Sequence, residues 1–539
     1  MKNKIKYFVL SAVAGLLLAS CHDIDVPITT QMTPDVFPQN EEQYAQTAGA
    51  VYSAFRGEYA HSFFFLSTIS TDEGILPARG GNWYDNQGYM KMHYHNWDKD
   101  HGATNYLWYI TEKAIGVNNQ AYYILNNVMP EGANKNRTLA ELRTMRAISY
   151  FIMMDFYGNV PLDTVYGDFE PRTNTPRAQV FEFIESELKK AIPNLSEETG
   201  DATYGRPTKW TAQALLAKMY LNAEYYTGTA RWNDCIAAAD AVINSGKFAI
   251  EPRSSYLQMF YPDNGPQMKE FIFAVPFDPS AAAYPGTNGQ MYRARYDVPR
   301  SLQAKFELPF RPSAPMSTLP EFYAIFSDPG DIRNDQWLTG PQYMNDGVTP
   351  IMVTTTKKGY DQFYTGADGG EPYTYHVTLS PDITLRQNPD LFDCGNDEIA
   401  WNMGYRNIKF YPDASSTNRN QNNDVPYLRY SDVILMKAEA ILRGGTPTLG
   451  HTALSLVNMV RENRSTSPAW TTVTLEDLYS ERGRELVYEC WRRNDMIRFG
   501  KFEDSWGFKT NNETYRRILP IPTDAMKLNS LLVQNPGYN

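Results

Sequence analysis

The stretch from residue 71 to residue 100 carries the side chains best suited to bind a ligand. It combines four Gly and one Pro with a dense set of Trp, Tyr and His residues, a composition that neither a helix nor a simple strand accommodates. We therefore expect a long, structured loop. Long loops on a rigid scaffold usually carry function.

Trp83 and Tyr84 lie in the middle of this loop and have polar side chains around them. A pyranose ring presents an apolar C–H face that stacks on an indole, while its hydroxyls need hydrogen-bond donors and acceptors beside the ring. The loop offers both kinds of contact, which favours a carbohydrate ligand. The polar side chains that we expect to contribute are Arg79, Asn82 and Asp85.

Glycines stand on both sides of Trp83, with Gly80 and Gly81 before it and Gly88 after it. They allow the backbone to expose the indole, so we expect Trp83 at the surface. The alternative is that Trp83 fastens the loop to the scaffold. Trp97, in contrast, adjoins a predicted helix and is expected to anchor the core.

Asp72 and Glu73 form the one pair of adjacent carboxylates beside the aromatic residues, and an enzyme would have to use them. A glycoside hydrolase needs two carboxyl groups about 5 to 9.5 Å apart across a cleft, whereas adjacent side chains point in different directions. We therefore predict no catalytic pair and expect one of the two to accept backbone hydrogen bonds in the turn. Asp72 is retained as a possible ligand contact.

His93, His95 and His101 could ligate a metal ion only together with a further ligand at a suitable spacing. The sequence shows none, and hydrogen-bonded structural histidines are commoner. The acidic, Gly-rich stretch at 361–371 lacks the spacing of an EF-hand, which leaves a structural Ca²⁺ ion as an open alternative. No other metal and no cofactor are predicted.

The longest helical pattern runs from residue 138 to residue 162. Its apolar residues recur at three- and four-residue spacing, which predicts a wide buried face, and Gly158 and Pro161 end it. Three other stretches carry Ala residues one turn from Leu, Met or Tyr, a pattern typical of closely packed antiparallel helices, and they are expected to be its partners. They are 211–223, 431–442 and 451–464. The chain is thus predicted to be mainly α, a helical-repeat scaffold with its ligand site on loops.

Four further helices are predicted at 41–59, 104–129, 177–192 and 232–244. Between 254 and 423, clusters of Pro, Gly, Asn and Asp alternate with short apolar runs, which predicts an irregular lobe with short strands. A second ligand-contact region is expected in this lobe, with Tyr296, Trp337 and Tyr343 as candidates. The predicted division is a helical region at 41–250, the lobe at 251–425, and helices with an extended tail at 426–539.

The first twenty residues predict an export signal. Three lysines precede an apolar run that is too short to span a bilayer comfortably, and the ending Leu-Ala-Ser-Cys at 18–21 resembles a bacterial lipobox. Cys21 would then carry the lipid anchor, followed by a tether at 21–40. Asp23 and Asp25 resemble an acidic tag for export to the outer face of the outer membrane. A plain secretory signal is the alternative.

Loss of the three signal-peptide lysines would lower the formal net charge from −11 to −14, which argues against a nucleic-acid partner. Beyond Cys21 three cysteines remain, and no CxxC spacing occurs. Neither a disulfide framework nor a zinc site is predicted.

Several motifs spread along the chain together resemble the SusD/RagB family of outer-membrane glycan-binding lipoproteins. No single motif is specific, but the set covers nearly the whole length of the chain. The motifs are the lipobox, the Leu142-Arg143-x3-Ala147-x2-Tyr150 helix ending in YGNVPL at 157–162, LRYSDV at 428–433, ERGREL at 481–486 with RRNDMIRFG at 492–500, and QNPGY at 534–538.

This resemblance implies tetratricopeptide-like helical pairs with an irregular lobe, no catalytic activity, capture of oligosaccharide at the cell surface, and a TonB-dependent outer-membrane transporter as partner. In the family, sugar-stacking aromatic residues occupy the corresponding loop, and Trp83 and Tyr84 match them by position. A surface glycoside hydrolase and a peptide-capturing relative are the alternatives. The charged residues from 482 to 495 are expected to form ion pairs that lock the last helices to the tail.

Overall fold

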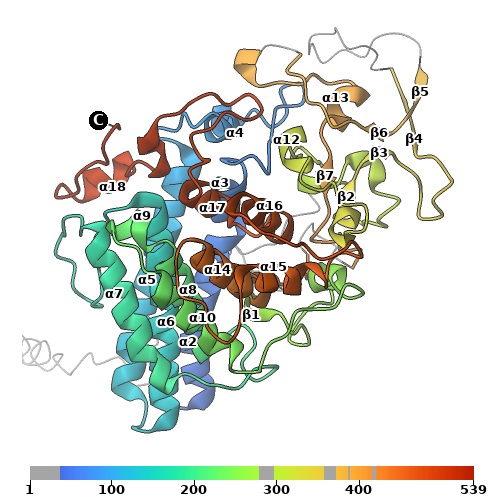
Figure 1. Ribbon diagram of the computed structural model, residues 1–539. Coiled ribbons are helices and arrows are strands. Elements are labelled where there is room, and N and C mark those ends of the chain that lie inside the picture. The colour runs from blue at the N-terminus through green and yellow to red at the C-terminus, as the bar shows by residue number, and fades with distance from the viewer. Residues whose placement is uncertain (1–36, 278–295, 357–371, 387–388, 416–420, 539) are drawn as a thin grey trace, which may run out of the picture.

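Figure 1 shows the fold of the chain as a computed structural model. The structure describes residues 37–277, 296–356, 372–386, 389–415 and 421–538, so the export signal, Cys21 and most of the tether lie outside the described residues. In this part of the chain, no helix has both the length and the hydropathy needed to cross a bilayer. The described residues are mainly helical, as predicted.

Four long helices form one side of the molecule (Figure 1). Helix α2 packs on α5, α5 on α6, and α6 on α7. A connection of only a few residues joins α5 to α6, so these two helices run antiparallel. The four helices are α2 (Glu41–Glu58), α5 (Gly102–Val128), α6 (Ala133–Tyr157) and α7 (Arg177–Ala191).

The second group of helices continues the stack. Helix α7 packs on α8, α8 on α10 and α14, and α14 on α15 and α16. The predicted helices at 211–223, 431–442 and 451–464 are confirmed within a few residues, but they pack chiefly within this group, whereas α6 packs chiefly between α5 and α7. The group comprises α8 (Lys209–Leu221), α10 (Trp232–Ile243), α14 (Tyr430–Leu442), α15 (Ala453–Arg461) and α16 (Leu475–Leu486).

From Leu139 onward, helix α6 is buried on all sides rather than along one face. From Leu139 to Tyr157, every residue except Arg143 is buried. Its polar side is closed by α7, because Arg143 and Arg146 both pair with Glu187, the first at 2.7 Å. The sequence indicated the apolar face, and the ion pairs explain why the opposite face is also interior.

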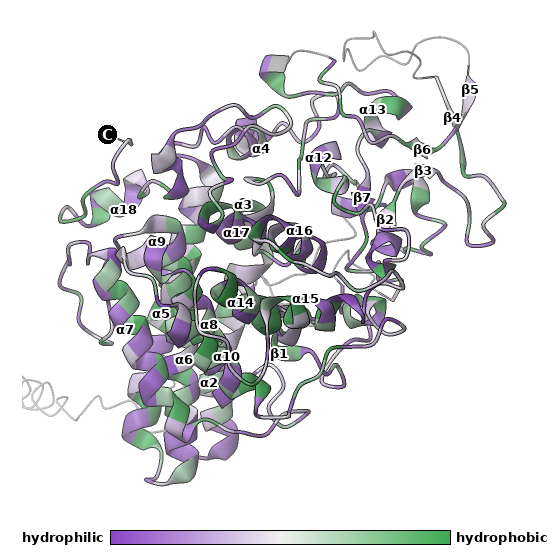
Figure 2. Ribbon diagram, viewed as in Figure 1, coloured by the Kyte–Doolittle hydropathy of each residue, from purple (hydrophilic) through white to green (hydrophobic). Residues whose placement is uncertain are grey.

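Helix α16 is largely hydrophilic in residue type, as Figure 2 shows, yet it lies against the apolar helix α14. Its Glu481, Arg482 and Glu485 are fully buried. Arg482 pairs with Asp495 at 2.8 Å and with Asp432 at 2.9 Å. Ion pairs form as predicted, but these pairs join α16 to α14 and to α17 (Arg492–Arg498) rather than to the tail.

The C-terminal tail lies across the helices. The amide of Leu519 donates to the Phe156 carbonyl at 2.7 Å, and the Asn535 side chain donates to the Tyr157 carbonyl at 2.9 Å. Trp97 is buried, and its indole N–H donates to the Tyr538 hydroxyl at 2.8 Å. The prediction of Trp97 as a core anchor is confirmed.

The irregular lobe is bracketed by one strand pair, since β1 and β8 lie antiparallel at the points where the chain enters and leaves the lobe. The lobe has a small apolar core of its own, built on residues such as Val298, Leu302 and Phe306. The strands are β1 (Phe271–Val275) with β8 (Val425–Arg429), β2 (Trp337–Leu338) with β7 (Arg406–Asn407), β3 (Gly340–Pro341) with β6 (Thr378–Leu379), and β4 (Met352–Thr355) with β5 (Tyr373–His376). The exact domain boundaries stay predictions.

Short helices complete the described chain. They are α3 (Phe64–Thr68), α4 (Gly88–His93), α9 (Ala223–Thr227), α12 (Pro320–Tyr323), α13 (Glu398–Asn402) and α18 (Thr523–Leu528). Helix α4 lies inside the predicted loop at 71–100, and α18 lies in the tail that was predicted to be extended. Both have only six residues, too few for a helical period to stand out in the sequence.

Candidate functional site

The loop at 71–100 is fastened to the lobe at its centre. The backbone amides of Gly80 and Gly81 donate to the two carboxylate oxygens of Asp393 at 2.7 and 2.8 Å. Arg79 is completely buried and donates to the carbonyls of Ala400 and Met403. The expectation that Arg79 contacts a ligand is therefore wrong in this structure, because its guanidinium holds the loop instead.

Trp83 lies half-buried on this fastened loop. Its ring centroid is 5.5 Å from that of Tyr296, with the rings inclined at 62°, and 6.5 Å from that of Tyr89. Tyr296 is 6% exposed, so it supports the indole from within rather than reaching a ligand as predicted. Trp83 was expected at the surface, with packing against the scaffold as the alternative. The structure shows it partly exposed and partly packed.

The backbone around Trp83 is strained. Trp83, Asp85, Asn86 and Gln87 have φ angles of 66, 42, 50 and 66°, in the left-handed region that residues other than glycine rarely adopt. Such strain persists only where the surrounding structure enforces it, and it concentrates at functional sites. The strained turn presents Asp85 and Asn86 at the surface.

A cavity of about 720 Å³ opens beside this turn. Its wall combines aromatic rings, carboxylates, an amide and an ammonium group, so it offers both stacking surfaces and hydrogen-bond partners. Asp85 is the one predicted contact that lines it directly. The sequence pointed to this stretch but did not predict the other polar and aromatic side chains of the wall as ligand contacts. They are Ser62, Phe65, Asn86, Tyr89, Lys91, Asp100, His101 and Tyr106.

His101 connects the cavity wall to helix α5. Its Nδ1 accepts from the Thr104 amide at 3.4 Å, and its Nε2 lies 3.0 Å from the Gly88 carbonyl. The carbonyl requires Nε2 to carry the proton. Burial lowers the pKa of His101, so the ring is neutral and acts as a structural clamp.

The other two histidines of the loop are interior groups. His93 and His95 are buried, and burial lowers the pKa of His93 to about 3. His95 contacts the Ser70 carbonyl through Nε2 at 2.9 Å. Among the described residues, no group of three or more His, Cys, Asp or Glu side chains is arranged to hold a metal ion. The stretch at 361–371, considered for Ca²⁺, lies outside the described residues.

Asp72 and Glu73 lie at the foot of the loop and point to different partners. Both oxygens of Asp72 accept from the Arg492 guanidinium, at 2.7 and 2.6 Å. Glu73 is fully buried and accepts from the Tyr488 amide at 3.2 Å. Glu73 therefore serves a backbone donor, but a distant one at Tyr488 rather than one in its own turn as expected. The Asp72 carboxylate is occupied by an ion pair with Arg492.

The remaining predicted contacts occupy varied positions. Asn82 is exposed, and its side chain donates to the Arg79 carbonyl at 3.0 Å. The Tyr84 hydroxyl accepts from Gln87 at 2.8 Å. Trp337 is 6% exposed and packs edge-to-face on aromatic neighbours, so it is a core residue. Tyr343 is 37% exposed and lies in the lobe with its ring 5.2 Å from that of His376.

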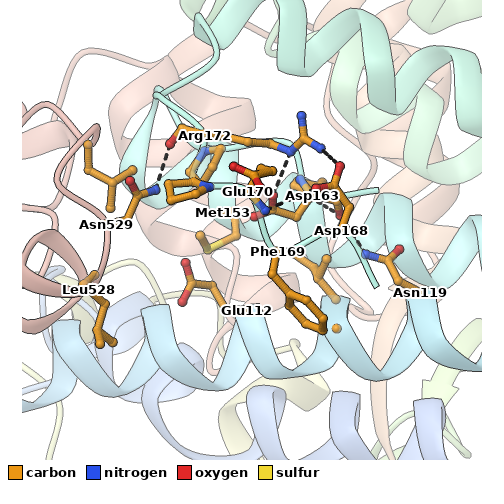
Figure 3. Close-up of a pocket in the computed structure, with 17 residues that line it drawn as sticks. Glu112, Asn119, Met153, Asp163, Asp168, Phe169, Glu170, Arg172, Leu528 and Asn529 are labelled. Carbon is orange, nitrogen blue, oxygen red and sulfur yellow. Dashed lines mark hydrogen bonds and ion pairs between the residues drawn. The ribbon is translucent and has the colours of Figure 1, made fainter. Parts of the chain in front are cut away.

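A second cavity, of about 400 Å³, lies between α5, the 161–172 segment and α18 (Figure 3). Glu112 of α5 points into it, and Phe169, which is 88% exposed, stands at its rim. Arg172 pairs with Asp163 at 3.2 Å and also with Asp168. None of the contacts predicted from the sequence lines this cavity, so the loop cavity is the better candidate for the functional site.

The chain is similar to known proteins over most of its length. The profile described as "SusD family" matches residues 214–538, and the profile described as "Starch-binding associating with outer membrane" matches residues 25–221. The starch-binding protein SusD of Bacteroides thetaiotaomicron is 25% identical to this chain over 443 residues, which cover 76% of this chain and 74% of that protein.

Solved structures share this fold. A laminarin-binding SusD-like protein is 22% identical, with a TM-score of 0.69 over 93% of this chain and 100% of its own. Surface glycan-binding protein A from Bacteroides thetaiotaomicron, in complex with laminarihexaose, is 19% identical, with a TM-score of 0.68 over 92% of this chain and 99% of its own.

Proposed function

Since the chain belongs to the SusD family, we propose that it is a carbohydrate-binding protein of the outer membrane whose ligand occupies the loop cavity beside Trp83. The observation that carries the proposal is the strained turn at 83–87. Its Asp85 and Asn86 line a cavity of about 720 Å³, and the half-buried indole of Trp83 lies at the start of the same turn, outside the cavity lining. An indole supported by Tyr89 and Tyr296 supplies the flat apolar face that a sugar ring needs.

The polar wall of the cavity supports the same ligand class. Asp85 and Asp100 accept hydrogen bonds, Lys91 donates them, and Asn86 does both. A sugar hydroxyl is both donor and acceptor, so a mixed wall suits it better than a wall of one charge. The relatives described above that are named for starch, laminarin and glycan binding add support from homology.

Binding without catalysis is part of the proposal. Asp72 is held by Arg492, and Glu73 is enclosed in the interior, so neither can act as acid or nucleophile on a bound glycan. Purified protein incubated with oligosaccharides should leave them uncut. Release of reducing ends, abolished by Asp72→Asn or Glu73→Gln, would instead favour a surface glycoside hydrolase.

The test of the site is a pair of aromatic substitutions measured against a glycan array and then by calorimetric titration. Trp83→Ala and Tyr89→Ala should each weaken binding of the best array ligand by roughly thirty-fold, since loss of a central aromatic anchor costs about 2 kcal/mol or more. Trp232→Ala is the matched control, because Trp232 is a partly buried indole on α10, away from the cavity lining.

Two outcomes would count against the proposed site. Unchanged affinity in both aromatic variants would place the ligand elsewhere. Strong binding of peptides with no binding of glycans would favour the peptide-capturing alternative.

Delivery to a TonB-dependent transporter and anchoring through Cys21 extend the proposal. Both come from the family resemblance, and a transporter that closes over the cavity would retain a weakly held sugar. Solubilisation of outer membranes in mild detergent should recover the two proteins together. Deletion of the transporter should stop uptake while glycan binding by this protein persists, and repeated failure to co-purify would argue against the partnership.

A further inference from the structure

A third cavity, of about 430 Å³, lies on the irregular lobe and is rich in hydrogen-bond donors. It is walled by the segment that begins at Arg300, by strand β4 and by the start of α13. Its charged and hydroxyl-bearing walls include Arg300, Ser301, Arg311, Thr354, Thr355 and Glu398. Two guanidinium groups face one carboxylate, so the described lining has a net positive charge although the whole chain is acidic.

The two arginines lack the partners that arginines elsewhere in the structure have. Within the described chain, neither Arg300 nor Arg311 forms a hydrogen bond or an ion pair, whereas Arg333, Arg429 and Arg464 each engage at least two carboxylates. A guanidinium carries five N–H donors in a planar fork and stays charged in proteins. Unlike those three buried arginines, Arg300 is partly buried and Arg311 is exposed, so water can solvate their donors, and both guanidinium groups keep N–H donors available to an anion that enters the cavity.

Arg300 is held in position by an aromatic ring rather than by an acid. Its guanidinium carbon lies 3.6 Å from the ring centroid of Trp401, a stacked arrangement that Arg favours. Burial and the neighbouring Arg311 both lower the pKa of Arg300, whereas Glu398 opposes that shift. An oxyanion between the two guanidinium groups would relieve their repulsion and could be bound through paired N–H donors.

Two short segments of the chain, 393–401 and 296–300, each contribute residues both to this cavity and to the support of the Trp83 loop. Trp401 and Glu398 belong to α13, and the adjoining residues Ala400 and Asp393 hold the loop that bears Trp83. Tyr296, which packs under Trp83, precedes Arg300 by four residues, a separation that spans at most about 14 Å between Cα atoms. One oligosaccharide with an acidic group could therefore contact both places.

We propose that the Arg300–Arg311 cavity binds a carboxylate or sulfate group of the captured glycan, so that the substrate is an acidic oligosaccharide. This inference rests on the proposed function and adds the chemical class of the sugar. The shared chemistry is an oxyanion with two or more acceptor oxygens, as in a uronic acid or a sulfate ester. Neutral glycans would lack this contact.

The test uses the soluble protein from residue 37 onward together with an array of neutral, uronate-containing and sulfated glycans. The best ligands should carry an acidic group, and the array separates uronate from sulfate. Calorimetric titration then compares the best acidic ligand with its neutral form, made by methyl esterification or desulfation. The acidic form should bind at least about tenfold more tightly at low salt, and added NaCl should reduce this difference.

Substitutions locate the effect. Arg300→Gln with Arg311→Gln should remove the preference for the acidic form and leave affinity for the neutral form unchanged, whereas Arg300→Lys with Arg311→Lys should retain part of it, because lysine keeps the charge but not the fork. Arg253→Gln is the control, since Arg253 is exposed and does not line the cavity. A thermal melt of each variant confirms that it is folded.

The outcomes of this test separate the two proposals. An array that returns only neutral glycans, or an acidic preference that survives in the double Gln variant, overturns this inference and leaves the proposed function standing. Weaker binding of both the acidic and the neutral glycan in Trp83→Ala, together with loss of only the acidic preference in the double Gln variant, supports both. An array in which no glycan of any class binds counts against both.

Discussion

The pH dependence of the unfolding free energy should report on Glu73, a buried carboxyl group at the start of the ligand loop. It is completely buried, accepts a hydrogen bond from the Tyr488 amide, and lies near Arg492 and Asp72. Burial raises the pKa of its carboxyl group from the ordinary value of 4.5 to about 8, although the Tyr488 hydrogen bond and the Arg492 charge oppose the shift. Glu73 is thus protonated in the folded protein at neutral pH.

Because the folded and unfolded states bind the Glu73 proton with different affinity, the unfolding free energy depends on pH. The folded state keeps its proton up to a pKa of about 8, while the unfolded state loses it near 4.5, so the folded state binds more protons between these values. The stabilisation that Glu73 contributes is complete below pH 4.5 and is lost as the pH rises through 8. With about 1.4 kcal/mol for each pH unit, the wild-type protein should lose roughly 2 to 3 kcal/mol of unfolding free energy between pH 5 and pH 7 through this group.

Glu73→Gln should remove this dependence, because the amide stays neutral and keeps an oxygen for the Tyr488 amide. Urea unfolding from pH 5 to pH 8 measures the difference between the wild-type protein and the variant, which cancels the contribution of other groups such as His93. Glu170→Gln, at an exposed carboxylate, should run parallel to the wild type. If Glu73→Gln also runs parallel, the carboxylate is ionised in the interior and the reasoning from burial fails.

Three further predictions test other parts of the structure. Arg482→Ala should lower the unfolding free energy by about 3 to 5 kcal/mol in a urea titration, because Asp432 and Asp495 lose their shared buried partner; the exposed Arg253→Ala should change it little. Asp393→Ala should weaken glycan binding about tenfold and change the melting temperature little, since it frees the amides of Gly80 and Gly81. Equal affinity would show that the loop keeps its shape without this carboxylate. Cys21→Ala should move the protein from the membrane to the soluble fraction. Protease added to whole cells should digest the wild-type protein, and complete protection in intact cells would contradict its exposure at the surface.

The helical scaffold was predictable because its signals are local. Apolar residues at three- and four-residue spacing, with glycine or proline at the ends, predicted eight helices that the structure contains. The largest displacement is that of the helix predicted at 138–162, which is α6 at Ala133–Tyr157, five residues earlier at both ends. Trp97 was assigned to the core from its place beside such a helix. Short elements such as α4 escaped notice, because the left-handed turn at 85–87 that precedes it has no local signature.

The burial of individual site residues was not predictable, because it depends on partners that are distant in sequence. Arg79 looked like a ligand donor, yet its acceptor at Ala400 lies 321 residues further along the chain. Tyr296 and Trp337 were candidate ligand contacts in an irregular lobe, and both are enclosed by other rings. The residue types that bind sugars are also those that hold loops together, so type alone could not separate the two roles.

The C-terminal motifs that carried the family resemblance also hold the ligand loop. Arg492 of α17 binds both oxygens of Asp72, and the amide of Tyr488, between α16 and α17, binds Glu73. The buried ion pairs of Arg482 fix α16 and α17 relative to each other, and therefore fix both contacts at the foot of the loop. A buried ion network is not strong evidence for added stability. Here it orients the helices that hold Asp72 and Glu73 at the start of the ligand loop. Substitutions around residues 481–495 should therefore alter ligand affinity as well as stability, although none of these residues lines the cavity.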